Sequence, residues 1–231
     1  MTTEEMLVKV AENREKLYEA GKQAEYDAFW DTVQNYGNRT TYAYIFTNWN
    51  CEYIRPKYKV VPTGGGLNQI FSWNGKLKKV EAEYFDFSQN PTPTAASSGN
   101  YYTFYNCVEL EEIEDIGLSA YFYSSTFGNN YALHTIARLP FREDTIMDTN
   151  VFRNCQSLEN LTIDGVIPTN FDIRYSTKLT HDSLMSIINA LKDYSADTSG
   201  TTYTLTIGGK NVAKLSTEEL QIIRSKGWKY A

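Results

Sequence analysis

The clearest pattern of apolar and polar positions is a ten-residue arrangement that occurs four times between residues 71 and 161. Each copy has Phe at its first place, Leu at its seventh, and Val, Ile or Leu at its tenth. The copies span residues 71–80, 104–113, 127–136 and 152–161, so they start 33, 23 and 25 residues apart. Three copies also carry Asn at the third place, namely Asn106, Asn129 and Asn154. Such repetition predicts a fold built from stacked copies of one small unit.

The longer first interval is explained by an insertion. Residues 88–100 are polar and rich in Pro, Ser and Gly, which is typical of a surface loop. Without them the period is about 20–25 residues, within the range of leucine-rich repeats. One unit of this kind is too small to bury its own Phe and Leu, so neighbouring units must stack with their strands parallel. A fifth, degenerate copy is indicated at Phe46, although it lacks the Leu.

A helical pattern precedes the repeats. Residues 2–36 are predicted to be helical, with a break at Gly21 and an end near Gly37. The first part has a narrow apolar stripe and is polar on its other sides. This leaves two interpretations open. The segment either packs on its own domain as a surface helix, or pairs with copies of itself to form a homo-oligomer through residues 3–20.

The pattern changes again after the repeats. Thr180 is the predicted N-cap of a helix that ends near Leu191, and residues 203–207 alternate as a strand. Ser216 and Glu219 have the spacing of a capping box, which opens a last helix. This tail is expected to cover the end of the repeats, because a terminal unit would otherwise expose apolar surface and an unpaired strand edge.

The predicted fold class is α/β: a short leucine-rich-repeat solenoid with parallel strands, N-terminal helices and a C-terminal α/β cap. The expected domains are an N-terminal helical segment at residues 1–37, the solenoid at 38–179 and a helix–strand–helix cap at 180–231.

Alignment of the copies also predicts contacts between them. The eighth place holds, in order, Lys78, Glu111, His134 and Glu159. Because parallel strands lie about 4.8 Å apart, Lys78 should face Glu111, and His134 should lie between Glu111 and Glu159. This ladder either fixes the register of the strands or forms a polar stripe that contacts a ligand.

Tyrosine is abundant, with 18 residues among 231. A tyrosine gives a large contact area at a low cost in entropy, which suits a recognition surface, although the same rings can fill a core. Together with the four ladder residues, Tyr101, Tyr102 and Tyr123 are therefore the candidate binding residues.

Charge and hydropathy narrow the classes of partner. The formal net charge is −6 and the pI is about 5.1, which argues against nucleic-acid binding because that needs a basic face. No apolar run approaches the roughly 20 residues of a membrane span. The polar start of the chain lacks the features of a secretory signal, so synthesis in the cytoplasm is expected.

Candidate chemistry is sparse. Three cysteines and two histidines are too few and too scattered for a disulfide framework or a zinc site, so no metal and no cofactor are expected. Cys107 and Cys155 share the fourth place of the repeat and are predicted to be small buried residues of the core. No nucleophile, phosphate-binding or metalloprotease motif occurs, so the chain is predicted not to be an enzyme.

The Phe-x-Asn-Cys-x-x-Leu-x-x-Ile/Leu pattern resembles the BspA-type leucine-rich repeats of bacterial surface and host-contact proteins. Several segments are also similar to uncharacterised proteins of Firmicutes phages and prophages. These segments are residues 24–31, 36–40, 152–163, 176–191 and 213–228. The resemblance implies a phage-encoded, tail-associated module with no catalytic residues.

The resulting functional hypothesis is a phage structural or receptor-binding module that contacts a protein or glycan of the host surface and becomes part of the virion. The alternative is an intracellular protein that binds a host factor, which the acidic charge and the polar N-terminus allow.

Overall fold

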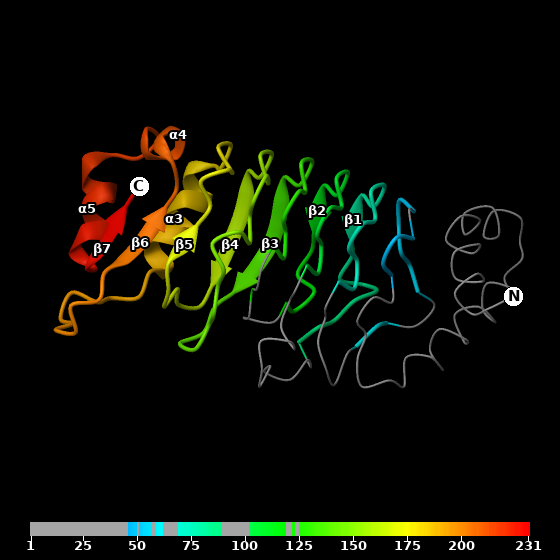
Figure 1. Cartoon of the computed structure of the whole chain (residues 1–231), viewed down its shortest axis with the longest axis horizontal. Coiled ribbons are helices and arrows are strands. Elements are labelled where there is room, and N and C mark those ends of the chain that lie inside the picture. Colours follow the sequence, from blue (N-terminus) through cyan, green and yellow to red (C-terminus); the bar gives the residue numbers. More distant parts are fainter. Residues whose placement is uncertain are drawn as a thin grey trace, which may run out of the picture.

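The computed structural model describes residues 46–49, 51–56, 59–61, 69–88, 102–118, 122 and 125–231. The predicted helical segment at 2–36 and most of the predicted loop at 88–100 lie outside these residues. Within them, the chain is α/β, with parallel strands in two sheets and few helices. The strands follow one another in chain order along the long axis of the molecule (Figure 1).

The first sheet is formed by the repeats. Its strands are β1 (Lys79–Val80), β2 (Glu112–Ile113), β3 (Thr135–Pro140) and β4 (Asn160–Asp164), in the order β1-β2-β3-β4, with every neighbouring pair parallel. The ninth and tenth places of the aligned copies pair with one another throughout, which confirms the register predicted from the sequence. A β-bulge between Ile136 and Leu139 lengthens β3 beyond the pattern.

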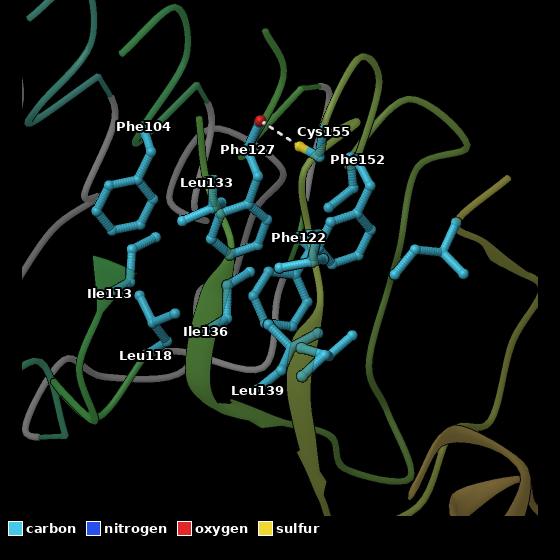
Figure 2. Close-up of a cluster of buried hydrophobic side chains, with 14 of the residues drawn as sticks. Phe104, Ile113, Leu118, Phe122, Phe127, Leu133, Ile136, Leu139, Phe152 and Cys155 are labelled. Atoms are coloured by element: carbon cyan, nitrogen blue, oxygen red, sulfur yellow. Dashed lines mark hydrogen bonds between the residues drawn. The ribbon is translucent and has the colours of Figure 1, made fainter. Parts of the chain in front are cut away.

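A column of phenylalanines forms the core beside this sheet. The first-place rings of neighbouring copies stack with centroids 5.2 to 5.6 Å apart and planes within 14° of parallel. Figure 2 shows three of them, Phe104, Phe127 and Phe152, side by side from left to right. The tenth-place residues are buried on the same side, and the rings fill the space between the strands and the returning chain.

The degenerate copy at Phe46 joins the same column. Its ring stacks on Phe71 with centroids 5.6 Å apart. Cys51, 9% exposed, precedes Glu52, whose carbonyl accepts the backbone N–H of Lys78 at 2.8 Å. In the later copies, the carbonyl that accepts the corresponding N–H belongs to the eighth-place residue. Glu52 is therefore at the eighth place of the degenerate copy, and Cys51 is at the seventh place, where the other copies have Leu.

The second sheet lies at the C-terminal end. It contains β5 (Phe171–Asp172), β6 (Tyr203–Thr206) and β7 (Trp228–Tyr230), all parallel, in the order β5-β6-β7. Three helices accompany it: α3 (His181–Ala190), α4 (Gly209–Val212) and α5 (Thr217–Ser225). None of the described helices is long and apolar enough to cross a bilayer.

The predicted helix caps are confirmed. The Thr180 side chain accepts the backbone N–H of Ser183, and Ser216 and Glu219 form both bonds of the capping box. The strand expected at 203–207 is β6. In contrast, β5, α4 and β7 were not predicted, because these short elements lie outside the aligned copies and show neither the alternation of β6 nor a capping motif.

The edge of β4 is covered by α3. Leu184, Ile187 and Ile188 are buried on the inner side of this helix. The Ser183 hydroxyl accepts the backbone N–H of Leu161 at 2.9 Å, and the Ser186 hydroxyl accepts that of Ile163 at 2.9 Å. Side chains of a helix therefore take the place that the carbonyls of a further strand would occupy, which protects the edge from pairing with another chain.

Candidate functional site

The predicted ladder residues occupy neighbouring positions on the first sheet. The backbone N–H of Glu111 donates to the carbonyl of Lys78 at 2.8 Å, that of His134 to Glu111 at 2.9 Å, and that of Glu159 to His134 at 3.0 Å. The four residues therefore follow one another in the expected order, one in each copy.

Their side chains form a less continuous ladder than the alignment predicts. Lys78 faces Glu111 with its Nζ 3.9 Å from the carboxylate, but it lies closer to Glu109, at 2.7 Å. His134 makes no ion pair within the described part of the chain, and its Nδ1 lies 3.0 Å from the hydroxyl of Thr135. The sixth-place Glu109 competes for the lysine, so the row of charges ends before it reaches His134.

A stronger ion-pair group lies on the adjacent outward positions. Lys79 Nζ lies 2.6 Å from Glu114 and 3.0 Å from Glu112, and its pKa is raised by these two hydrogen-bonded carboxylates. Glu114 also accepts the backbone N–H of Ala82 at 2.8 Å. Bonding to Lys79 and to that N–H holds the pKa of the Glu114 carboxyl below its ordinary value. These contacts tie β1 to β2 across the exposed face.

Two arginines extend the polar face in both directions. The guanidinium of Arg55 donates to Glu81 at 2.8 and 3.0 Å. Arg138, which follows the bulge in β3, bonds to Asp164 and lies 3.4 Å from Asp115. Neither group was predicted from the sequence, because Arg55 belongs to the degenerate copy and Arg138 lies two residues beyond the tenth place of its copy.

Among the tyrosines proposed for binding, Tyr102 is described by the structure, whereas Tyr101 and Tyr123 lie outside the described residues. Tyr102 is half-buried and packs edge-on against Tyr105, with ring centroids 5.1 Å apart. Tyr105 in turn contacts Trp73, which is 49% exposed. Sequence reasoning missed Trp73 and Tyr105, although the signal was present: Trp73 occupies the place where the other three complete copies have Asn.

The two cysteines of the repeat are buried and bonded, as Figure 2 shows for Cys155. Their thiols donate to backbone carbonyls, Cys107 to Phe71 at 3.0 Å and Cys155 to Phe127 at 2.9 Å. Burial raises the pKa of each thiol to about 12, so both stay protonated. The prediction of small buried core residues is confirmed, with the addition that each is also a hydrogen-bond donor.

Within the described residues, no three His, Cys, Asp or Glu side chains come together in a group that could hold a metal ion. Comparison with protein-family models, curated proteins and solved structures finds no match to this chain. The geometry of the exposed surface is therefore the basis for its proposed role.

Proposed function

We propose that the protein is a non-enzymatic binding module: a short leucine-rich-repeat solenoid of the BspA type, encoded by a phage, that contacts the host surface. The observation that carries this proposal is the uniform parallel register of the copies, which buries one row of apolar residues and repeats one row of polar residues outward. Stacked units of this kind present an extended surface, and such surfaces commonly bind partners.

The electrostatics of the outward face support recognition rather than catalysis. A catalytic acid or base works best when its pKa lies near the working pH. Here the pKa values move away from neutrality: upward for Lys79 and Arg138, and downward for Glu109 and Glu114. The side chains keep their charges and their partners, which suits a surface that presents a fixed pattern to a ligand.

The experiment is a cell-binding assay with the full chain. The chain is labelled at an engineered exposed cysteine, Ser199→Cys, and mixed with cells from a panel of Firmicutes species. Saturable binding that unlabelled chain displaces supports the proposal. Absence of cell binding, together with recovery of one stoichiometric partner from a lysate of the same cells, would instead support the intracellular alternative.

The proposal includes self-association through residues 3–20. Light scattering coupled to size-exclusion chromatography tests this directly. The full chain is expected to elute as an oligomer and a chain without residues 1–20 as a monomer. A monomeric full chain would remove this part of the proposal and leave the binding module intact.

A further inference from the structure

The third place of the repeat has an unusual backbone conformation in every described copy. Its residues have a left-handed backbone with φ between 60° and 63°, and they are Asn48, Trp73, Asn106, Asn129 and Asn154. Asparagine tolerates this region because its short side chain can bond to the local backbone, whereas a bulky side chain is disfavoured there. Four asparagines are thus explained by the turn itself, and Trp73 is not.

Trp73 receives little compensation from packing. About half of its surface is exposed, at 49%, and its main ring contact is the edge of Tyr105, with centroids 5.5 Å apart. Tyr105 packs edge-on against Tyr102, whose own φ is 49°. A bulky residue kept in a strained conformation with its ring in solvent points to a function at that position.

Other exposed aromatic rings lie on the same edge of the molecule. Tyr175 is 40% exposed and stands at the corresponding place, since Ser176 donates its backbone N–H to Ile173 as Cys155 donates to Phe152, although the backbone of Tyr175 itself is not left-handed. Tyr131, 46% exposed, occupies the fifth place of its copy. Among the described residues, the large apolar side chains that are equally exposed elsewhere, Ile146 and Val166, are aliphatic.

Amide side chains lie between these rings. Asn106, Asn129 and Asn154 separate Trp73 from Tyr175 along the third place, and the Asn154 amide donates to the Asn129 side-chain oxygen at 2.8 Å. We call Trp73, Asn106, Asn129, Asn154 and Tyr175, with the neighbouring Tyr102, Tyr105 and Tyr131, the turn row. It combines aromatic faces with groups that both donate and accept hydrogen bonds. Its members carry no formal charge, but the exposed Arg153 and Arg174 lie beside it, at the place that Tyr105 holds in its own copy.

We propose that the turn row binds a neutral, extended polysaccharide. Pyranose rings would stack on Trp73 and the tyrosines, and sugar hydroxyls would bond to the asparagine amides. The period supports this ligand class, because neighbouring copies are spaced about 4.8 Å apart, close to the length of one sugar in an extended β-linked chain. A periodic surface is matched by a periodic ligand.

A protein partner fits the row less well. Stable protein interfaces bury about 800 Å² on each side and centre on a packed, desolvated patch. The turn row is a narrow band of residues along an edge, with one cluster of three rings at Trp73, Tyr105 and Tyr102 and with amides between that cluster and Tyr175. The inference rests on the proposed function only in taking the host surface as the source of the glycan.

The test measures binding of β-1,4-linked N-acetylglucosamine and β-1,4-linked glucose, each as a trimer and a hexamer, by calorimetry with the full chain. The hexamer of at least one sugar is expected to bind about tenfold more tightly than its trimer, because it reaches more copies. Trp73→Asn should weaken hexamer binding by about tenfold or more. Trp73→Phe, which keeps an aromatic face, should retain part of the affinity.

The same substitution separates loss of function from loss of structure. Because Asn suits the left-handed turn, Trp73→Asn is expected to raise the Tm by about 2 °C while binding is lost. The matched control is Ile146→Asn, which replaces an exposed apolar residue outside the turn row and should leave the affinity unchanged.

Two results would overturn the inference: no binding of any of the four oligosaccharides, or equal binding by Trp73→Asn and the unmodified chain. Loss of cell binding after protease treatment of the cells would indicate a protein receptor and also count against it. If the chain binds cells but no sugar, the proposed function stands and this inference fails. If the chain binds the hexamer but no cells, this inference stands and the proposed function fails.

Discussion

At the scale of single residues, the inner side of each turn depends on a small polar side chain at the fourth place. Asn74 donates its amide to the first-place carbonyl of its own copy, Phe71, at 3.0 Å and to that of the preceding copy, Phe46. The thiols of Cys107 and Cys155 donate to the preceding copy, to Phe71 and Phe127. Buried carbonyls need partners, and amide, thiol and hydroxyl groups can all provide one. This explains Asn74, Cys107 and Cys155 at the fourth place. Asn130, at the same place of its copy, instead accepts the backbone N–H of Cys107 at 3.0 Å, and its Nδ2 has no hydrogen-bond partner among the described residues.

Replacing Cys155 by Ala removes the donor to the Phe127 carbonyl and leaves a small void. The expected loss is about 1–2 kcal/mol in the free energy of unfolding, measured by urea denaturation. Thr162→Ala, on the exposed side of β4, is the control and should change stability by less than about 0.5 kcal/mol. Equal stability of Cys155→Ala and the unmodified chain would show that the thiol acts only as a small apolar group.

At the scale of elements, the sheet is held at its edge and across its face by side chains. Ser183 and Ser186 complete the hydrogen bonding of β4, and Lys79 joins β1 to the two glutamates that follow Glu111 along β2. The serine contacts are buried or partly buried, whereas the side chains of Lys79 and its two glutamates are 30–34% exposed. The two groups of contacts are therefore expected to differ in how much they stabilise the fold.

Ser183→Ala leaves the buried N–H of Leu161 without its acceptor. The expected cost is about 1–3 kcal/mol, because an unsatisfied buried donor loses its solvation without replacement. Thermal unfolding followed by circular dichroism measures it. Ser225→Ala, on the exposed side of α5, is the control, and a Tm change no larger than that of the control would show that water replaces the hydroxyl.

The ion pair on the sheet face predicts a dependence on pH. The pKa of Glu114 is lowered in the folded state, so its contribution is complete above the ordinary value of 4.5 and is lost as the pH falls through the folded pKa. Glu114→Gln should therefore be less stable than the unmodified chain at pH 7, and the difference in the free energy of unfolding should narrow as the pH falls below 4.5.

The control is Glu83→Gln, which removes an exposed carboxylate close to β1 in the chain and leaves the contacts of Lys79 with Glu112 and Glu114 in place. Chemical denaturation at each pH gives the difference directly. A constant difference between pH 7 and acid would mean that the charge of Glu114 does not contribute.

The elements that the sequence predicts are those with local or periodic signals. The tenth-place pairing follows from the repeat, and the caps at Thr180 and Ser216 follow from short motifs. β5 and β7 have no such signal. Each is two or three residues long and pairs only with β6, whose partner residues lie 34 positions (Phe171 to Leu205) and 25 positions (Tyr203 to Trp228) away along the chain, with no repeat to reveal the pairing.

The candidate site was predictable to the same extent. Backbone neighbours such as Lys78 and Glu111 follow from the alignment. Side-chain partners do not, since a lysine can reach several carboxylates and takes the nearest one. The role of the third-place Asn was also only partly foreseen: it is selected by the left-handed turn, and Trp73 stands out only when that backbone angle is known.

At the scale of the whole molecule, one continuous apolar core links the first described copy to the C-terminal sheet. It includes Phe46 at one end and Trp228 at the other. Small domains are stable by only about 5–15 kcal/mol, so a defect in the middle of such a core should be felt at both ends.

Phe127→Ala tests this coupling, because its ring stacks between Phe104 and Phe152 with centroids 5.5 and 5.2 Å away. The substitution should destabilise the chain by about 3–5 kcal/mol. Hydrogen exchange measured by mass spectrometry should then accelerate in β1 and in α5 alike. Faster exchange confined to the neighbourhood of β3 would show that the two ends unfold independently.

The start of α3 has a consequence for the length of the molecule. Thr180 continues the eighth-place series, since its backbone N–H donates to Glu159 at 2.9 Å, and the chain turns into a helix at the next residue. The end of the first sheet is therefore determined by one short segment, separate from the copies before it. Inserting or deleting a whole copy upstream changes the length of the exposed rows by one step, while the same terminal unit still fits the last strand. A chain organised in this way can match ligands of different lengths by changing its number of copies, while its C-terminal segment stays the same.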